Sequence, residues 1–132
     1  MKFKTKLIEE RFKLCHQKLK DIAEDLDHLC DEAGEELVIT ESFTTKSEDS
    51  KVKGRMSDTH RTGRALDIRV KDWDKIFINE FIYYANTRYK PYAAVLKDGT
   101  RQLIKYGDKL HLDHIHLQLN RSFTMPKIKE DN

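Results

Sequence analysis

The feature that most restricts the fold of this chain is a strict alternation of polar and apolar residues near its C-terminal end. The pattern runs His114-Ile115-His116-Leu117-Gln118-Leu119. Side chains of a β-strand point alternately to the two faces of a sheet, so a strand over Leu110–Leu119 places both imidazoles on one face and the apolar side chains on the other. The alternation therefore predicts a sheet with one face buried in a core and one face carrying polar groups.

The N-terminal quarter of the chain has a different period. Apolar residues recur at three- and four-residue steps from Leu7 to Ala33, which predicts one long helix facing the core and ending at Gly34. Cys15 and Cys30 both fall in this predicted helix, where a rise of ~1.5 Å per residue separates them by ~22 Å, too far for a disulfide. We expect both to be buried, reduced thiols.

The remaining elements follow from β-branched runs and turn residues. Strands are predicted over Leu37–Phe43 and Arg64–Val70, and a helix over Trp73–Tyr89 with Asp72 as its N-cap. Asp98-Gly99, between apolar runs over Tyr92–Leu96 and Arg101–Tyr106, indicates a hairpin. Thr44–Thr59 lacks apolar periodicity and is expected to be a long exposed loop. This order of elements predicts an α+β fold, a small antiparallel sheet with helices packed against it.

Length and composition limit the classes of function. The chain has 132 residues, enough for one compact domain, which we place at 1–125 with a flexible tail at 126–132. Its net charge of +2 is too small, and its charges too interspersed, to favour nucleic acid as a partner. No apolar run approaches the ~20 residues that membrane insertion requires. Acidic residues interrupt the N-terminal apolar stretch, so we expect a product made in the cytoplasm without a signal peptide.

Two segments, 58–68 and 111–119, concentrate residue types that bind metals. His114-x-His116 alone is a weak signal, since a solvated strand face also carries such pairs. Asp67 adds weight because aspartate is depleted in strands, and a buried carboxylate is costly unless it is paired or bound to a cation. A salt bridge from Asp67 to Arg64 or Arg69 is the alternative to a metal site.

Taken together, these residues resemble a known family. His60-x-x-Gly63-x-Ala65-x-Asp67, followed downstream by Asp113-x-x-His116, is similar to the motifs of the zinc D-alanyl-D-alanine carboxypeptidase and L-alanyl-D-glutamate endopeptidase family. That family includes small phage endolysins and the vancomycin-resistance dipeptidases. His114-x-His116 also resembles the wider group that adds the lysostaphin-type peptidases and the hedgehog signalling domain.

The resemblance implies a role for each matching residue. His60, Asp67 and His116 would be the three protein ligands of a Zn²⁺ ion whose fourth position stays open to water, with the zinc lying in a cleft on the sheet. Asp113 occupies the position of the family's catalytic acid-base residue, and His114 that of the auxiliary histidine of the lysostaphin-like branch.

Two positions depart from the family pattern. Asp58 stands where the family usually has a serine, and the run Glu41-Ser42-Phe43-Thr44 lacks the arginine expected there. Lys46, Arg55 or Arg61 is expected to take over binding of a substrate carboxylate or of the oxyanion. The alternative for the loop that carries Lys46 and Arg55 is a solvated lysine-rich segment without a substrate role.

The resemblance implies a zinc metallopeptidase that cleaves stem peptides of bacterial peptidoglycan. We expect an L-alanyl-D-glutamate endopeptidase of the phage lysis or tail-associated type, which acts as a monomer and reaches the cell wall once it is released. Two alternatives stay open at this stage. One is a D-alanyl-D-alanine carboxypeptidase or dipeptidase, and the other is a zinc-stabilised binding module without turnover, in which His114 could close the fourth position.

Overall fold

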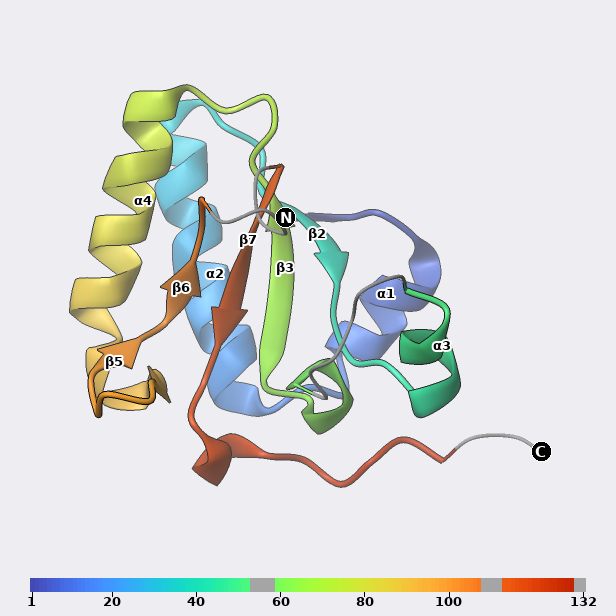
Figure 1. The fold of residues 1–132 in the computed structure, drawn as a ribbon. Helices are drawn as coiled ribbons and strands as arrows, with labels where there is room; N and C mark the ends of the chain where they lie inside the picture. Colours follow the sequence, from blue (N-terminus) through green and yellow to red (C-terminus); the bar gives the residue numbers. More distant parts are fainter. Residues whose placement is uncertain (53–58, 108–112, 130–132) are drawn as a thin grey trace.

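The computed structural model describes residues 1–52, 59–107 and 113–129, and within them it is a mixed α/β structure with a small sheet and four α-helices (Figure 1). The main sheet has the strand order β1-β2-β3-β7-β6. Its strands are β1 (Lys2–Phe3), β2 (Val38–Glu41), β3 (Ala65–Arg69), β7 (His114–Gln118) and β6 (Ile104–Lys105). A separate hairpin joins β4 (Ala94–Val95) to β5 (Arg101–Gln102).

The sequence predicted an antiparallel sheet, but one pair of strands in the structure is parallel. β2, β3, β7 and β6 pair antiparallel, but β1 adds to β2 in parallel, with Lys2 opposite Val38. A two-residue strand is too short to show an alternation of polar and apolar residues, and this is why the sequence pattern did not predict it.

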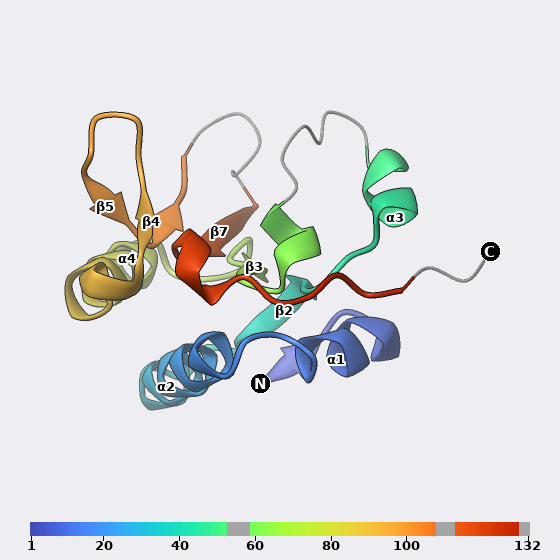
Figure 2. The same ribbon diagram turned by 90° about the horizontal axis from the view of Figure 1, so that it is seen from below.

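The helices are α1 (Lys6–Phe12), α2 (Gln17–Ala33), α3 (Lys46–Ser50) and α4 (Lys75–Arg88). Figure 2 shows α1 and α2 below the sheet and α3 on the opposite side. α2 and α4 contribute to one hydrophobic core, in which Leu19, Leu26 and Phe81 are fully buried. None of the helices in the described part of the chain combines the length and the apolar character that crossing a bilayer requires.

Strand β7 confirms the predicted alternation of faces, and its neighbour β3 is arranged in the same way. Leu66 and Ile68 of β3 and Ile115 and Leu117 of β7 are completely buried against the helices. The residues between them face the other side of the sheet. The sheet therefore has one face in the core and one face available for a site.

The prediction of a single N-terminal helix is wrong. The chain breaks between α1 and α2, where the His16 side chain caps α2 by accepting a hydrogen bond from the Lys18 amide over 3.0 Å. Cys15 lies in this break, not in a helix, and both Cys15 and Cys30 are buried and free. Burial raises the pKa of each thiol to about 12. The helix end at Gly34 is confirmed, with a left-handed φ of 74°.

The prediction of a long exposed loop over Thr44–Thr59 is wrong for its first half. α3 lies within it, held by a capping box between Thr45 and Glu48, and Asp49 is buried. The Thr45-x-x-Glu48 spacing is the sequence signal for this helix. Residues 53–58 lie outside the described part of the chain. A smaller correction concerns α4, which begins after Asp74 instead of Asp72.

Candidate metal centre

Three potential ligands meet on the open face of the sheet. Asp67 lies in the middle of β3, and His116 is its direct partner on β7. His60 comes from a short 3₁₀ helix, Thr59–Thr62, just before β3. The turn from that helix into β3 passes through Gly63, whose φ is 67°, and a Cβ there would lie 2.6 Å from the Phe43 ring. Glycine is therefore required at 63 for His60 to reach the sheet.

The side chains of these residues converge closely. The Asp67 Oδ1 lies 3.3 Å from the His60 Nε2 and 3.0 Å from the His116 Nδ1. One ligand atom from each residue lies within 4.8 Å of the others. The His60 and Asp67 side chains are 5% and 10% exposed and that of His116 is 11% exposed, so bulk water screens the group poorly.

Each imidazole is oriented through its outer nitrogen. The His60 Nδ1 donates to the Ser42 carbonyl oxygen over 3.0 Å, and the His116 Nε2 lies 3.0 Å from the Gln118 Oε1. These acceptors hold a proton on the outer nitrogen of each imidazole. Each ring, when it is neutral, therefore points the lone pair of its inner nitrogen at Asp67. Such an arrangement needs either a proton on each inner nitrogen or a shared cation, and metal-binding histidines typically have an outer acceptor of this kind.

The electrostatics of Asp67 also favour a positive charge next to its carboxylate. Burial raises the pKa of this carboxyl, but the charge of His60 and the hydrogen bonds from His116 and His60 outweigh it and hold the pKa far below its usual value. Asp67 is therefore ionised. Among the described residues the ion pairs of Asp67 are with histidines and not with Arg64 or Arg69, the predicted alternative, and the Arg64 Nη1 donates to the Leu119 carbonyl oxygen over 2.6 Å.

The donor set fits a divalent metal. Two imidazole nitrogens and one carboxylate oxygen are the protein ligands of many catalytic zinc sites, which keep a fourth position for water or substrate. Asp67 and His116 also come from strands whose other face is packed in the core, which limits their movement. His60, Asp67 and His116 could hold such an ion without rearrangement of the backbone.

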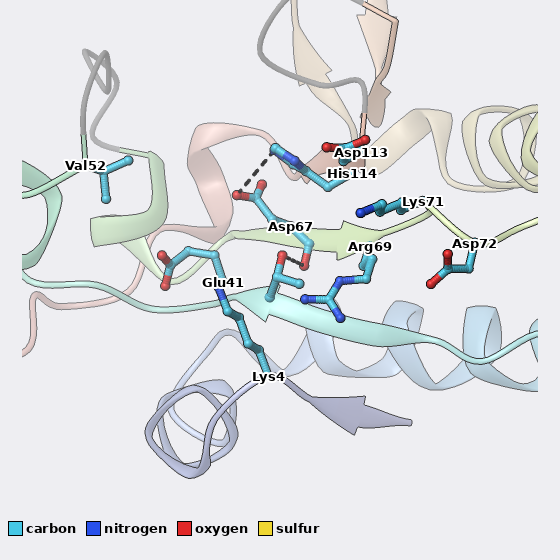
Figure 3. A pocket seen from close by; sticks show the side chains of 10 residues that line it. Lys4, Glu41, Val52, Asp67, Arg69, Lys71, Asp72, Asp113 and His114 are labelled. Carbon is cyan, nitrogen blue, oxygen red and sulfur yellow. Dashed lines mark hydrogen bonds and ion pairs between the residues drawn. The ribbon is translucent and has the colours of Figure 1, made fainter.

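A cleft of about 660 Å³ opens beside the three ligands, with Asp67 in its lining (Figure 3). His114 and Asp113 lie along its upper edge in this view. The His114 Nε2 is 4.0 Å from the Asp67 Oδ2, and the exposed Asp113 sits in the bend that precedes β7. The two residues predicted to be catalytic therefore lie next to the three predicted ligands.

The residues predicted to bind substrate are placed differently. The Arg61 Nε lies 3.1 Å from the buried Asp49 Oδ2, so the guanidinium forms an ion pair inside the protein. Lys46 is the exposed first residue of α3 and is not part of the cleft lining. Arg55 lies outside the described residues. For Lys46, Arg55 and Arg61, substrate binding stays a prediction.

Several residues of the site had no assigned role in the sequence. The cleft is also lined by Lys4, Arg69 and Lys71, which come from distant parts of the chain. Gln118 could have been found from the alternation that places it on the face of His116. Ser42 contributes a backbone carbonyl, which leaves no signal in the sequence. Comparisons with models of protein families, with curated proteins and with solved structures gave no match, so function has to be argued from the site itself.

Proposed function

We propose that this protein is a zinc-dependent peptidase that hydrolyses an amide bond in the stem peptides of bacterial peptidoglycan. One observation carries the proposal: His60, Asp67 and His116 converge with their ligand atoms within 4.8 Å of one another, beside an open cleft. The motif resemblance to the zinc carboxypeptidase and endopeptidase family supplies the substrate class.

Each residue of the site would have its own role in the reaction. Zinc, when bound by the three ligands, supplies a Lewis acid and a source of hydroxide near neutral pH. The Asp113 carboxylate takes the proton of the attacking water and passes it to the leaving amine. The His114 Nε2 donates a hydrogen bond to the oxyanion that develops at the scissile carbonyl. The Ser42 carbonyl and the Gln118 side chain keep both imidazoles in the orientation that the ligands need.

The alternative of a non-catalytic, zinc-stabilised module rests on His114. Its Nε2 is 4.0 Å from the Asp67 Oδ2, close enough to be drawn in as a fourth ligand. Two features favour the enzyme. The His114 side chain is 33% exposed and lines the cleft, and the acidic Asp113, for which a closed structural site has no use, lies beside it.

The test combines metal content with a chemical assay. The purified protein is analysed for zinc by inductively coupled plasma mass spectrometry and is then incubated with purified peptidoglycan, and the fragments are identified by mass spectrometry. We expect about one zinc per chain and new amino termini on stem fragments, with the L-alanyl-D-glutamate bond as the site of cleavage. Free D-alanine as the only product would instead assign the carboxypeptidase activity. Full zinc loading with intact peptidoglycan would assign the binding module.

A further inference from the structure

The cleft beside the metal centre has a cationic side whose residues have no role in the site described so far. Lys4, Arg69 and Lys71 line it, and all three are exposed. Figure 3 shows Arg69 and Lys71 on the side of Asp67 away from Glu41, with Arg69 at the end of β3 and Lys71 just beyond it, whereas the Lys4 side chain is drawn beside Glu41. Within the part of the chain that the structure describes, no ion pair involves the side chain of any of the three.

The β3–β7 pairing fixes Arg69 relative to the ligands. Arg69 follows Asp67 by two residues on β3, so both belong to the same face of the sheet and their Cα atoms are about 7 Å apart. Arg69 is also the direct partner of His114 on β7, as Asp67 is of His116. The guanidinium therefore borders the same cleft, one step farther along the sheet than the metal ligands.

We infer that Arg69, assisted by Lys71, forms a subsite for a carboxylate on the substrate, one or two residues beyond the bond that is cleaved. This inference rests on the proposed peptidase function. One extended residue spans about 3.5 Å, so a peptide whose scissile carbonyl lies at the metal ligands brings such a carboxylate within reach of the Arg69 side chain. A guanidinium binds a carboxylate through two parallel hydrogen bonds, which gives both affinity and orientation.

The composition of the cleft argues for a single carboxylate over a polyanion. Besides Asp67, the lining contains Glu41, Asp72 and Asp113. These acids would repel a polyphosphate or a nucleic acid backbone, whereas a peptide with one carboxylate could place it at the cations alone. Stem peptides of peptidoglycan carry such a free carboxylate on D-glutamate.

Binding can be tested apart from cleavage with a probe that lacks the scissile bond. The dipeptide in which the D-glutamate side-chain carboxyl is joined to L-lysinamide keeps the glutamate α-carboxylate as its only carboxylate, and its carboxamide analogue removes only that charge. Isothermal titration calorimetry compares both dipeptides on the zinc-loaded wild-type protein, on Arg69→Gln and on Arg121→Gln. Arg121 is exposed and does not line the cleft, so it is the matched control.

We expect the wild-type protein and Arg121→Gln to bind the carboxylate form about 10- to 100-fold more tightly than the carboxamide. Arg69→Gln should lose this preference, and Arg69→Lys should keep part of it because the charge remains while the paired hydrogen bonds are lost. Equal binding of both dipeptides by the wild-type protein, or an undiminished preference in Arg69→Gln, would overturn the inference. Hydrolysis of the corresponding tripeptide with N-terminal L-alanine is measured in parallel. Preferential binding without hydrolysis would overturn the proposed peptidase and leave the subsite standing.

Discussion

His116 faces Asp67 directly across the β3–β7 ladder, and its Nδ1 lies 3.0 Å from the Asp67 Oδ1. Two of the three proposed ligands are thus placed by the pairing of two central strands. The third, His60, is placed by a turn that only glycine at position 63 allows. The centre is therefore built mainly from backbone geometry, and this makes its response to substitution predictable.

The first prediction concerns the ligands. His60→Ala, Asp67→Asn and His116→Ala should each lose most of the bound zinc, because three protein ligands are the minimum of a typical catalytic site. Zinc per chain is measured after gel filtration in buffer free of chelator. His28→Ala, which replaces an exposed histidine of α2, is the control and should keep its zinc. Full zinc retention in the three ligand variants would mean that the metal binds elsewhere.

The second prediction concerns Gln118, which orients His116 through a 3.0 Å contact to its Nε2. Gln118→Leu removes the acceptor but keeps all three ligands, so zinc affinity should fall by about 10- to 100-fold without being abolished. Competition with a zinc-binding dye measures the dissociation constant. Gln102→Leu, on β5 and away from the ligands, should bind zinc like the wild-type protein. An unchanged affinity in Gln118→Leu would mean that this contact does not orient the ring.

The third prediction separates catalysis from metal binding. Asp113→Asn should keep its zinc and hydrolyse peptidoglycan about 10²- to 10⁴-fold more slowly, the usual contribution of a general base. Asp72→Asn, which lines the same cleft beyond Lys71, is the matched control for loss of a negative charge. If zinc-loaded Asp113→Asn works at the wild-type rate while His114→Gln does not, the role of base belongs to His114.

The fourth prediction concerns the buried Asp49. Its Oδ1 accepts a hydrogen bond from the Thr44 hydroxyl over 2.8 Å, and its Oδ2 lies 3.1 Å from the Arg61 Nε. Asp49→Ala removes the carboxylate that these groups share, so the free energy of unfolding should fall by about 3 kcal/mol. Urea denaturation measures it, and the exposed Lys51→Ala is the control. A change below about 0.5 kcal/mol would show that the pair contributes little to stability.

The fifth prediction concerns stability in acid. Burial raises the pKa of Glu48, but hydrogen bonds from the Thr45 backbone and from Arg11 outweigh it, so the pKa lies below its ordinary value. A carboxyl with a lowered folded-state pKa stabilises the fold above its unfolded-state pKa, and this stabilisation is lost as the pH falls through the folded-state pKa. Glu48→Gln should therefore lose less stability than the wild-type protein between about pH 6 and about pH 3.

Urea denaturation at several pH values measures this difference. Glu10→Gln, an exposed position on α1, is the control and should follow the wild-type curve. If Glu48→Gln lost as much stability on acidification as the wild-type protein, the Arg11–Glu48 contact would not be a source of the acid sensitivity.

The sequence predicted best what depends on a regular period. The alternation around Ile115 and Leu117 correctly separated the buried face from the face of the site, and β3 matches the predicted strand closely. The sequence-based prediction failed where a side chain interrupts a helix although the apolar spacing continues. His16 stops the helical pattern by capping α2, yet the apolar spacing continues across the break, so the pattern alone gave one helix.

The lining of the cleft could not be predicted for another reason. Lys4 lines the same cleft as Arg69 and Lys71 only because β1 and β3 flank β2, and the parallel pairing of β1 depends on two residues. By contrast, Asp67 could be singled out because aspartate is depleted in strands, and the motif resemblance joined it to His116. Residues that are ordinary in themselves acquire a role only through the arrangement of the strands.

The alternation within β3 and β7 also determines how this protein can change over evolutionary time. In both strands a site residue is followed by a core residue, as Asp67 is by Ile68 and His116 by Leu117. Insertion or deletion of one residue in either strand would turn ligands into the core and apolar side chains into the cleft at once. Such mutations cannot be compensated one at a time. New specificity must therefore arise by substitution within these strands, or by changes of length outside them.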